Sequence, residues 1–119
     1  MINIYYVDAD HERFFENHVD WKAETWHNAA CYLAGAFSVV ANNYDWIISK
    51  AWSTEGRNEV REKFKFNATS QRTAVEYLMA LVTGCRHDDC FIDISRALYF
   101  DDKNRRMLIQ TLMILLRWD

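Results

Sequence analysis

The C-terminal stretch DDKNRRMLIQTLMILLRW, residues 101–118, decides how the rest of the chain is arranged. Asp101 and Asp102 provide an N-cap and negative charge where a helix dipole is positive. Eight of the ten residues from Met107 to Leu116 are apolar, with the densest stripe at helical spacing. The run is far shorter than the roughly 20 residues of a membrane span. Because a helix that is apolar on nearly every side is covered by other elements, we predict a buried C-terminal helix at the centre of the domain.

The composition indicates one helical domain over residues 1–119. Half of the 119 residues are hydrophobic and 15% are aromatic, which argues against a disordered chain. There is no proline and there are only three glycines, so tight turns are scarce and helices are favoured over hairpins. The sequence therefore predicts a mainly α fold, a compact bundle of about five to seven helices around the C-terminal one.

Periodicity and capping residues place the expected helices along the chain. They cover residues 8–20, 24–36, 37–52, 69–83, 92–100 and 101–118, with a short helix from residue 58. Asn42-Asn43 is a candidate break in the third helix, residues 53–58 resemble a loop, and Gly84 is a helix stop. Ile2–Val7 fits one short strand or an extended arm, and Lys63–Phe66 fits a strand or part of the short helix.

Charge and cysteine usage bear on location and association. The N-terminus has neither the basic start nor the long apolar run of an export signal. Three cysteines, an odd number, favour reduced thiols, so we expect a cytoplasmic protein. Residues 1–56 hold three basic and eight acidic side chains, whereas residues 57–119 hold eleven and nine. A dipolar surface of this kind is compatible with head-to-tail association of copies of the chain.

Four carboxylates recur every fourth residue along the first expected helix, at Asp8, Glu12, Glu16 and Asp20. Like charges at this spacing cost about 0.2–0.5 kcal/mol per pair, and the helix dipole compensates only the first turn. A ridge of carboxylates about 6 Å apart resembles the charge spacing of a nucleic-acid backbone. The sequence therefore predicts a partner-binding ridge at these four residues, the alternative being an ordinary solvated helix face.

Three other groups of residues are weaker candidates for a site. Cys85, His87 and Cys90 are zinc-ligand types within six residues, yet their spacing also suits a plain polar loop. Five tryptophans favour either core corners or a pocket for a planar ligand. Basic side chains are interleaved with aromatic ones, as in proteins that bind single-stranded nucleic acid, at Arg57, Arg61, Lys63, Phe64, Lys65, Phe66 and Arg72. Neighbouring glutamates reduce the net positive charge of this segment. We expect no metal, no cofactor and no direct nucleic-acid binding.

No catalytic constellation is evident in the sequence. The three glycines are isolated, so neither a phosphate-binding loop nor a dinucleotide fingerprint is present. His11 lies near Glu12 and Glu16, but these acids are also accounted for as a charged helix start, and no nucleophile accompanies them. We therefore predict a protein that is not an enzyme.

With these motifs in view, the chain resembles a family of small uncharacterised helical proteins from Gram-positive bacteria and their phages. The matching segments are His11-Glu12-x-Phe14-Phe15, Trp26–Gly35 and Thr69–Arg72, the last followed by Leu78, Leu81 and Gly84. The resemblance implies the cytoplasm of a bacterial host and a role outside central metabolism. It brings no assigned catalytic residues.

These observations lead to two functional hypotheses. The first is a phage or mobile-element protein that binds a protein partner through the acidic ridge. Such a partner is a nucleic-acid-binding host protein, for example a CRISPR nuclease or another defence protein that the chain inhibits. The alternative is a small helical domain that sequesters a nucleotide or another small molecule in a tryptophan-lined pocket.

Overall fold

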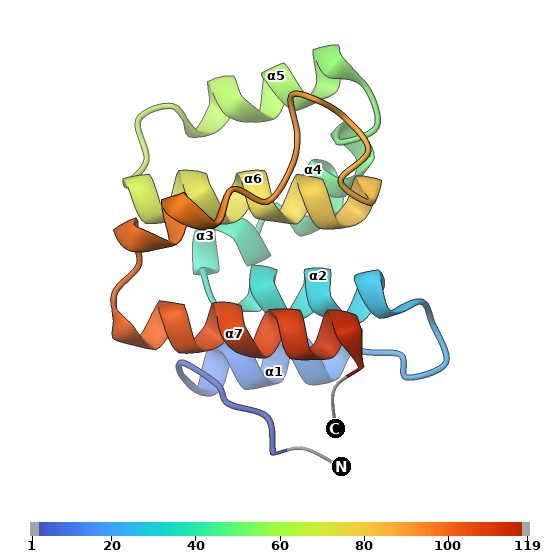
Figure 1. Ribbon diagram of the computed structural model, residues 1–119, viewed down its shortest axis with the longest axis vertical. Coiled ribbons are helices and arrows are strands. Elements are labelled where there is room, and N and C mark those ends of the chain that lie inside the picture. The colour runs from blue at the N-terminus through green and yellow to red at the C-terminus, as the bar shows by residue number, and fades with distance from the viewer. Residues whose placement is uncertain (1–2, 118–119) are drawn as a thin grey trace.

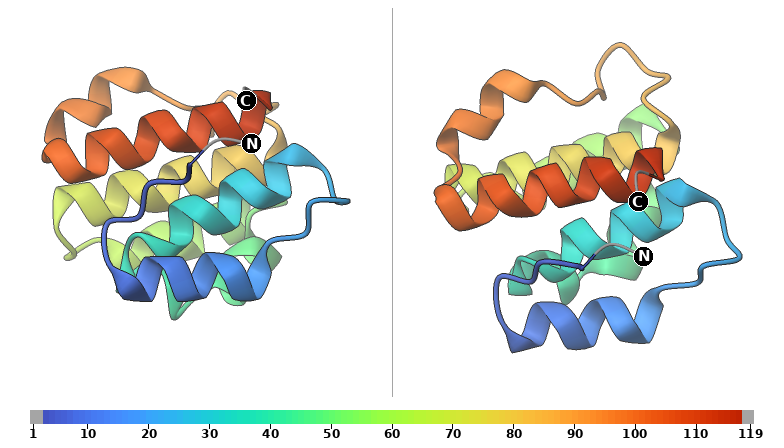
Figure 2. Two further views of the ribbon diagram at one scale, coloured as in Figure 1. Left: turned by 90° about the horizontal axis from the view of Figure 1, so that it is seen from below. Right: turned by 60° about the horizontal axis from the view of Figure 1, so that its bottom comes forward.

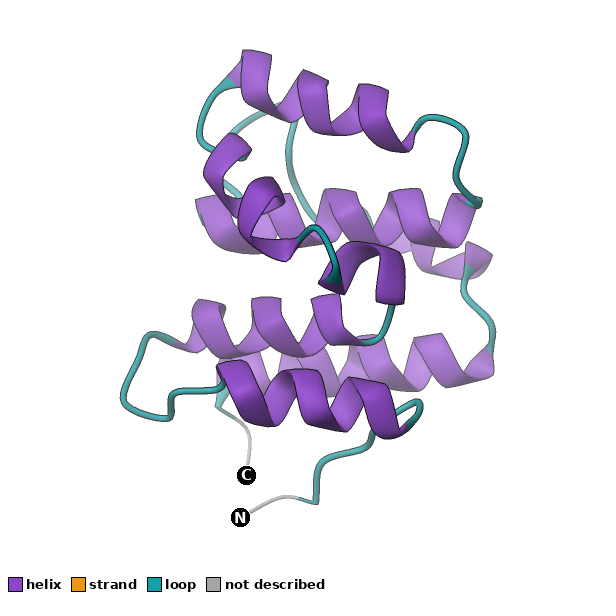
Figure 3. Ribbon diagram, turned by 180° about the vertical axis from the view of Figure 1, so that it is seen from behind, coloured by secondary structure: helices purple, strands orange, loops and turns teal. Residues whose placement is uncertain are grey.

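The chain folds into helices joined by short loops, as its shortage of glycine and proline predicts (Figure 3). A computed structural model describes residues 3–117. Within them lie seven α-helices and one 3-10 helix: α1 (Ala9–His18), α2 (Thr25–Gly35), α3 (Ser38–Ala41), α4 (Tyr44–Lys50), α5 (Thr54–Phe64), α6 (Thr69–Thr83), η1 (Ile94–Tyr99) and α7 (Asp102–Leu116). The predicted mainly α fold is confirmed.

The helices stack along the longest axis of the molecule, each lying across it (Figure 1). Helix α5 is at one end, next to α6, and α1 is near the other end. Between them α2 contacts α1, α6 and α7, and it passes between α1 and α7 in Figure 2. The centre of the molecule is therefore made by α2 and α6.

The prediction that the C-terminal helix is the buried centre is wrong. Helix α7 buries only one side, with Met107 and Ile114 inward, while Ile109 is 60% and Leu116 is 70% exposed. Leu112 is half-buried, and the predicted end at Trp118 lies outside the described residues. By contrast, every residue from 28 to 35 in α2 and from 77 to 83 in α6 is buried.

Side-chain size explains why α2 is central. Its buried residues include Ala29, Ala30, Ala34 and Gly35, which let three neighbouring helices approach closely. A Cβ built on Gly35 lies only 3.0 Å from the Phe14 ring of α1. Helix α7 covers α2 from one side and leaves Ile109 and Leu116 exposed.

Capping residues set several helix ends where the sequence predicts them. The Asp101 carboxylate accepts from the Asn104 amide at 2.9 Å and starts α7. Gly84 has φ of 70° and ends α6 in the left-handed conformation that favours glycine. Asn42-Asn43 separates α3 from α4, as expected.

The structure corrects the loop prediction near Gly56 and decides between the two alternatives for Lys63–Phe66. Residues 53–58 are not a loop, because Ser53 caps α5 by accepting from the Gly56 amide at 2.9 Å. Lys63–Phe66 is not a strand, since α5 continues to Phe64 and ends in a turn.

The N-terminal residues form the extended arm rather than a strand. The Tyr5 amide donates to the Gln110 side chain of α7 at 3.0 Å, and the Tyr32 hydroxyl of α2 donates to the Tyr5 carbonyl. The guanidinium of Arg106 lies 4.5 Å from the centre of the Tyr5 ring. Ile2, which the prediction included, lies outside the described residues.

Of the helices in residues 3–117, none combines the length and the apolarity that crossing a membrane requires.

Candidate functional site

The four predicted ridge residues do not form one helix face. Asp8 is the N-cap of α1, and its carboxylate accepts from the His11 amide at 2.8 Å. Glu12 and Glu16 are exposed on the helix. Asp20 lies beyond the end of α1 at His18, and its carboxylate accepts from the Lys22 amide at 3.0 Å. The ridge geometry is therefore wrong at its two ends, and Glu12 and Glu16 are its remaining pair.

A side chain of α2 explains why α1 stops before Asp20. Asn28 is buried, and its amide oxygen accepts from the Asp20 N–H at 2.9 Å. Its amide nitrogen donates to the Asp20 carbonyl, also at 2.9 Å. This two-sided clamp fixes the backbone of Asp20 in the connection between α1 and α2, so its carboxylate leaves the line of Glu12 and Glu16.

Aromatic side chains pack together on α1, the helix that carries Glu12 and Glu16. Phe15 is buried, and the Trp21 ring meets the Phe15 ring edge-on with their centroids 5.9 Å apart. Tyr6 of the N-terminal arm packs against the same Phe15 ring at 6.2 Å. The Trp21 side chain is 60% exposed. We call the surface made by Tyr6, Glu12, Glu16 and Trp21 the acidic–aromatic face.

The carboxylates of this face are not neutralised within residues 3–117. Neither Glu12 nor Glu16 has a basic side chain within ion-pair distance there, whereas nearby Asp10 pairs with Arg13. Burial raises the pKa of the Tyr6 hydroxyl, and the charges of Glu12 and Glu16 raise it further. Both carboxylates therefore act on the same aromatic neighbour, which places them on one side of α1 beside the arm.

His11 belongs to the core rather than to a reactive site. Its Nδ1 accepts from the Val7 amide at 3.1 Å, so its Nε2 carries the proton and donates to the Tyr32 carbonyl at 2.7 Å. Burial lowers the pKa of the imidazole, outweighing that hydrogen bond and the charge of Asp8, which raise it. Both ring nitrogens are occupied in joining α1 to the arm and to α2.

The segment from Cys85 to Cys90 is a short turn after α6. Cys85 is exposed, while Cys90 is buried and its sulfur accepts from the Thr83 hydroxyl at 4.0 Å. The third cysteine, Cys31, is buried in α2, and burial raises its pKa to about 12. In the part of the chain that the structure describes, no three His, Cys, Asp or Glu side chains are grouped to hold a metal ion.

Most of the predicted cation–aromatic set is used in internal contacts. Arg57 is only 1% exposed, and its guanidinium donates twice to Asp89, at 2.9 and 2.8 Å. Arg61 donates to both carboxylate oxygens of Glu76, at 2.7 and 2.9 Å, and also contacts Asp89. The pair Arg57–Asp89 thus ties α5 to the turn after α6. The other members divide as follows: Phe64 is buried, Lys63 lies over the Trp46 ring, Lys65 pairs with Glu62, and Phe66 and Arg72 are exposed.

The tryptophans among residues 3–117 differ in exposure and lie on different parts of the chain. Trp21 and Trp52 are exposed, and Trp26 and Trp46 are half-buried in different helices. Trp118 lies outside the described residues. Two adjoining clefts beside α6 contain no tryptophan in their walls and are lined by arginines instead. The sequence does not predict these clefts, because Arg96 lies far from Arg72 along the chain and η1 meets α6 only after folding.

No protein-family model, no curated protein and no solved structure matches this chain. The resemblance to proteins of Gram-positive bacteria and phages therefore stays a prediction.

Proposed function

We propose that the protein is a non-enzymatic binding module that recognises a partner protein through the acidic–aromatic face. The proposal is supported by an exposed tryptophan, Trp21, whose ring packs against Phe15 of α1, the helix that carries Glu12 and Glu16. No described basic side chain neutralises these two carboxylates. Tryptophan is enriched among the residues that dominate binding energy at protein interfaces. Carboxylates around such an anchor orient the partner by charge.

The size of the exposed indole supports an anchoring role. A buried aromatic side chain removes about 150–250 Å² from water, so the exposed part of Trp21 offers roughly 90–150 Å². At about 25 cal/mol per Å², covering that area contributes about 2–4 kcal/mol before the costs of association. The Phe15 ring beneath it is buried, so the anchor rests on a fixed support.

The charge of the face selects the partner. Glu12 and Glu16 are one helical turn apart, about 6 Å along the axis. We propose a partner with a basic surface, and among such proteins a nucleic-acid-binding one, whose groove is built for spaced negative charges. In biological terms, we propose that the protein serves a phage or another mobile element by binding a host defence protein.

The proposal is tested by capture with matched charge variants. Tagged protein is incubated with soluble extract of the source organism, and retained proteins are compared for the wild type and for Glu12→Lys/Glu16→Lys. We expect a retained basic protein that the double variant loses. The control is Glu59→Lys/Glu62→Lys, which makes the same charge change on α5, away from α1, and should still retain it.

The purified partner then gives an affinity. Trp21→Ala should weaken binding at least about tenfold, which corresponds to 1.4 kcal/mol. Added salt should weaken binding as well, because exposed charges are screened. Folded Glu12→Lys/Glu16→Lys protein that binds the same partner as tightly as the wild type would rule the acidic–aromatic face out.

A further inference from the structure

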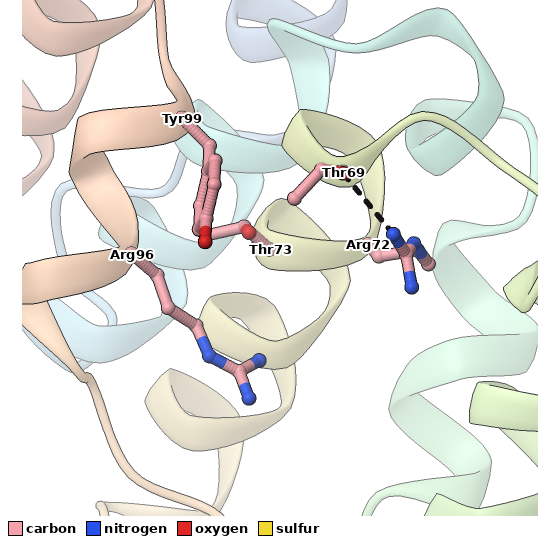
Figure 4. A pocket seen from close by; sticks show the side chains of 5 residues that line it. All are labelled: Thr69, Arg72, Thr73, Arg96 and Tyr99. Atoms are coloured by element: carbon pink, nitrogen blue, oxygen red, sulfur yellow. Dashed lines mark hydrogen bonds between the residues drawn. The ribbon is translucent and has the colours of Figure 1, made fainter.

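A cleft between α6 and η1 brings together two arginines that are far apart in the sequence. Its walls are Thr69, Arg72 and Thr73 from α6 and Arg96 and Tyr99 from η1, and its volume is about 330 Å³ (Figure 4). A second cleft of about 270 Å³ continues along α6 toward α5, and it shares Arg72 and Arg96. The α6 residues follow helical spacing, so one face of this helix forms the floor of both.

The two shared arginines carry charge that the described chain does not neutralise. Neither Arg72 nor Arg96 forms an ion pair within residues 3–117. The Arg72 guanidinium donates to the Thr69 hydroxyl at 3.1 Å, which steadies it at the rim (Figure 4). Glu76 also lines the second cleft, but both oxygens of its carboxylate accept hydrogen bonds from Arg61. The combined site is therefore positive.

A buried hydroxyl in the cleft has no partner of its own. Thr73 is 2% exposed, and its side chain forms no hydrogen bond with the rest of residues 3–117. The other buried helical threonines differ, because Thr83 donates to the Met79 carbonyl and Thr111 to the Met107 carbonyl, each at 2.9 Å. Thr73 and Tyr99 line the same cleft (Figure 4).

This hydroxyl retains contact with solvent through the cleft. Two polar side-chain atoms of the described residues are shut off from solvent and lack a hydrogen-bond partner, the Tyr44 hydroxyl and the Gln110 amide nitrogen. The Thr73 hydroxyl also lacks a partner, but it is not shut off from solvent in this way. Buried polar groups are normally hydrogen-bonded, so an unpartnered hydroxyl at the wall of a cleft indicates a place for a polar ligand.

We propose that this cleft binds a small phosphate monoester, with Arg72 and Arg96 donating to the phosphate oxygens. Two guanidinium groups match the charge of about −2 on a phosphate monoester, and their planar forks suit its oxygens. The hydroxyls of Thr73 and Tyr99 supply further donors. The cleft volume of about 330 Å³ is larger than a phosphate group requires and falls at the lower end of the volumes of small-molecule binding sites. The exposed Tyr99 ring offers a surface for a planar organic group, so a nucleoside monophosphate is the class we assign.

The test titrates the full-length protein with adenosine monophosphate, followed by calorimetry and by amide and arginine side-chain NMR signals. We expect saturable binding with shifts at Thr73 and Arg96, weaker binding of inorganic phosphate, and none of adenosine or succinate. Arg72→Gln and Arg96→Gln should each weaken binding about tenfold or more, the value of a hydrogen bond to a charged group. Arg86→Gln, at an exposed arginine outside the cleft, removes the same charge and should bind as the wild type does.

Thr73→Val separates a ligand-binding role from a structural one. Because the hydroxyl has no partner in the free protein, the variant should be as stable as the wild type or more stable. Its affinity for adenosine monophosphate should nevertheless fall about threefold to tenfold. The proposal is overturned if neither phosphate probe binds, if succinate binds as well as phosphate, or if Arg86→Gln and Arg96→Gln lose affinity equally.

Discussion

Replacing Gly56 by alanine tests how α4 and α5 meet. Alanine is ordinarily the better helix residue, and the exchange stabilises a helix by about 0.5–1 kcal/mol. In this structure, however, a Cβ on Gly56 would lie 2.0 Å from the carbonyl oxygen of Lys50 and 2.9 Å from its carbonyl carbon. Both atoms belong to the backbone at the end of α4, so a side-chain rotation does not relieve the clash.

The clash should reverse the usual sign of the exchange. Forcing an extra methyl group into a packed contact costs about 1–3 kcal/mol, and here it also disturbs the Ser53 cap, whose hydroxyl would lie 2.9 Å from the new atom. We expect a loss of about 1–3 kcal/mol, which lowers the melting temperature by about 4 °C per kcal/mol in a domain of this size. Urea unfolding followed by circular dichroism measures it.

Gly35→Ala provides the matched comparison. Its Cβ would meet the ring of Phe14 at 3.0 Å, and that half-buried side chain is able to shift, so the loss should be clearly smaller. Gly56→Ala protein that unfolds at the wild-type urea concentration or above would refute the close approach of α5 to Lys50.

Three further predictions concern stability. Asp89→Ala should lower the free energy of unfolding by about 2–3 kcal/mol, because it removes the partner of the buried Arg57 guanidinium. The loss is smaller than the 3–5 kcal/mol of a fully buried pair because Asp89 is partly exposed. In the same urea unfolding experiment, Asp88→Ala should change the free energy of unfolding by no more than about 0.5 kcal/mol. Leu33→Ala should cost about 2–5 kcal/mol and Leu116→Ala under about 0.5 kcal/mol; equal losses in thermal unfolding would place the core elsewhere. The lowered pKa of His11 means that the unfolded chain takes up its proton first, so stability should be complete above pH 6.5 and decline as the pH falls below it. His11→Gln keeps one acceptor and one donor but cannot be protonated in this range, so its urea midpoints measured between pH 5 and 8 should not show that decline. If the decline is unchanged in the variant, a group other than His11 causes it.

Local signals in the sequence were sufficient for some of the helix ends. Asp101 and Gly84 act on their own neighbours, so their capping roles follow from residue type and position. Ser53 carried the same kind of signal, an N-cap three residues before Gly56, but glycine was interpreted as a mark of a loop. The structure shows that Gly56 is needed for close packing inside the first turn of a helix.

The centre of the fold does not follow from the densest apolar run alone. That run lies in α7, which buries only one side, and Leu116 is exposed. Small residues such as Ala30 and Ala34 lie instead in α2, the helix that α1, α3, α6 and α7 contact. A run of alanine with glycine was therefore the better signal.

Sites that depend on distant contacts were beyond the sequence. The fourfold spacing of Glu12, Glu16 and Asp20 assumed a continuing helix, and the clamp from Asn28 that ends it comes from another helix. The pairing of Arg72 with Arg96 likewise depends on η1 folding back over α6. Residue types predicted charge, but only packing decides which charges stay unpaired.

The acidic–aromatic face is tested most directly by amide hydrogen exchange of the protein with and without its captured partner. We expect slowed exchange on binding to be concentrated in residues 9–23, which carry Glu12, Glu16 and Trp21. Slowed exchange confined to residues 91–99 instead, where Phe91, Ile94, Leu98 and Tyr99 are also exposed, would contradict it.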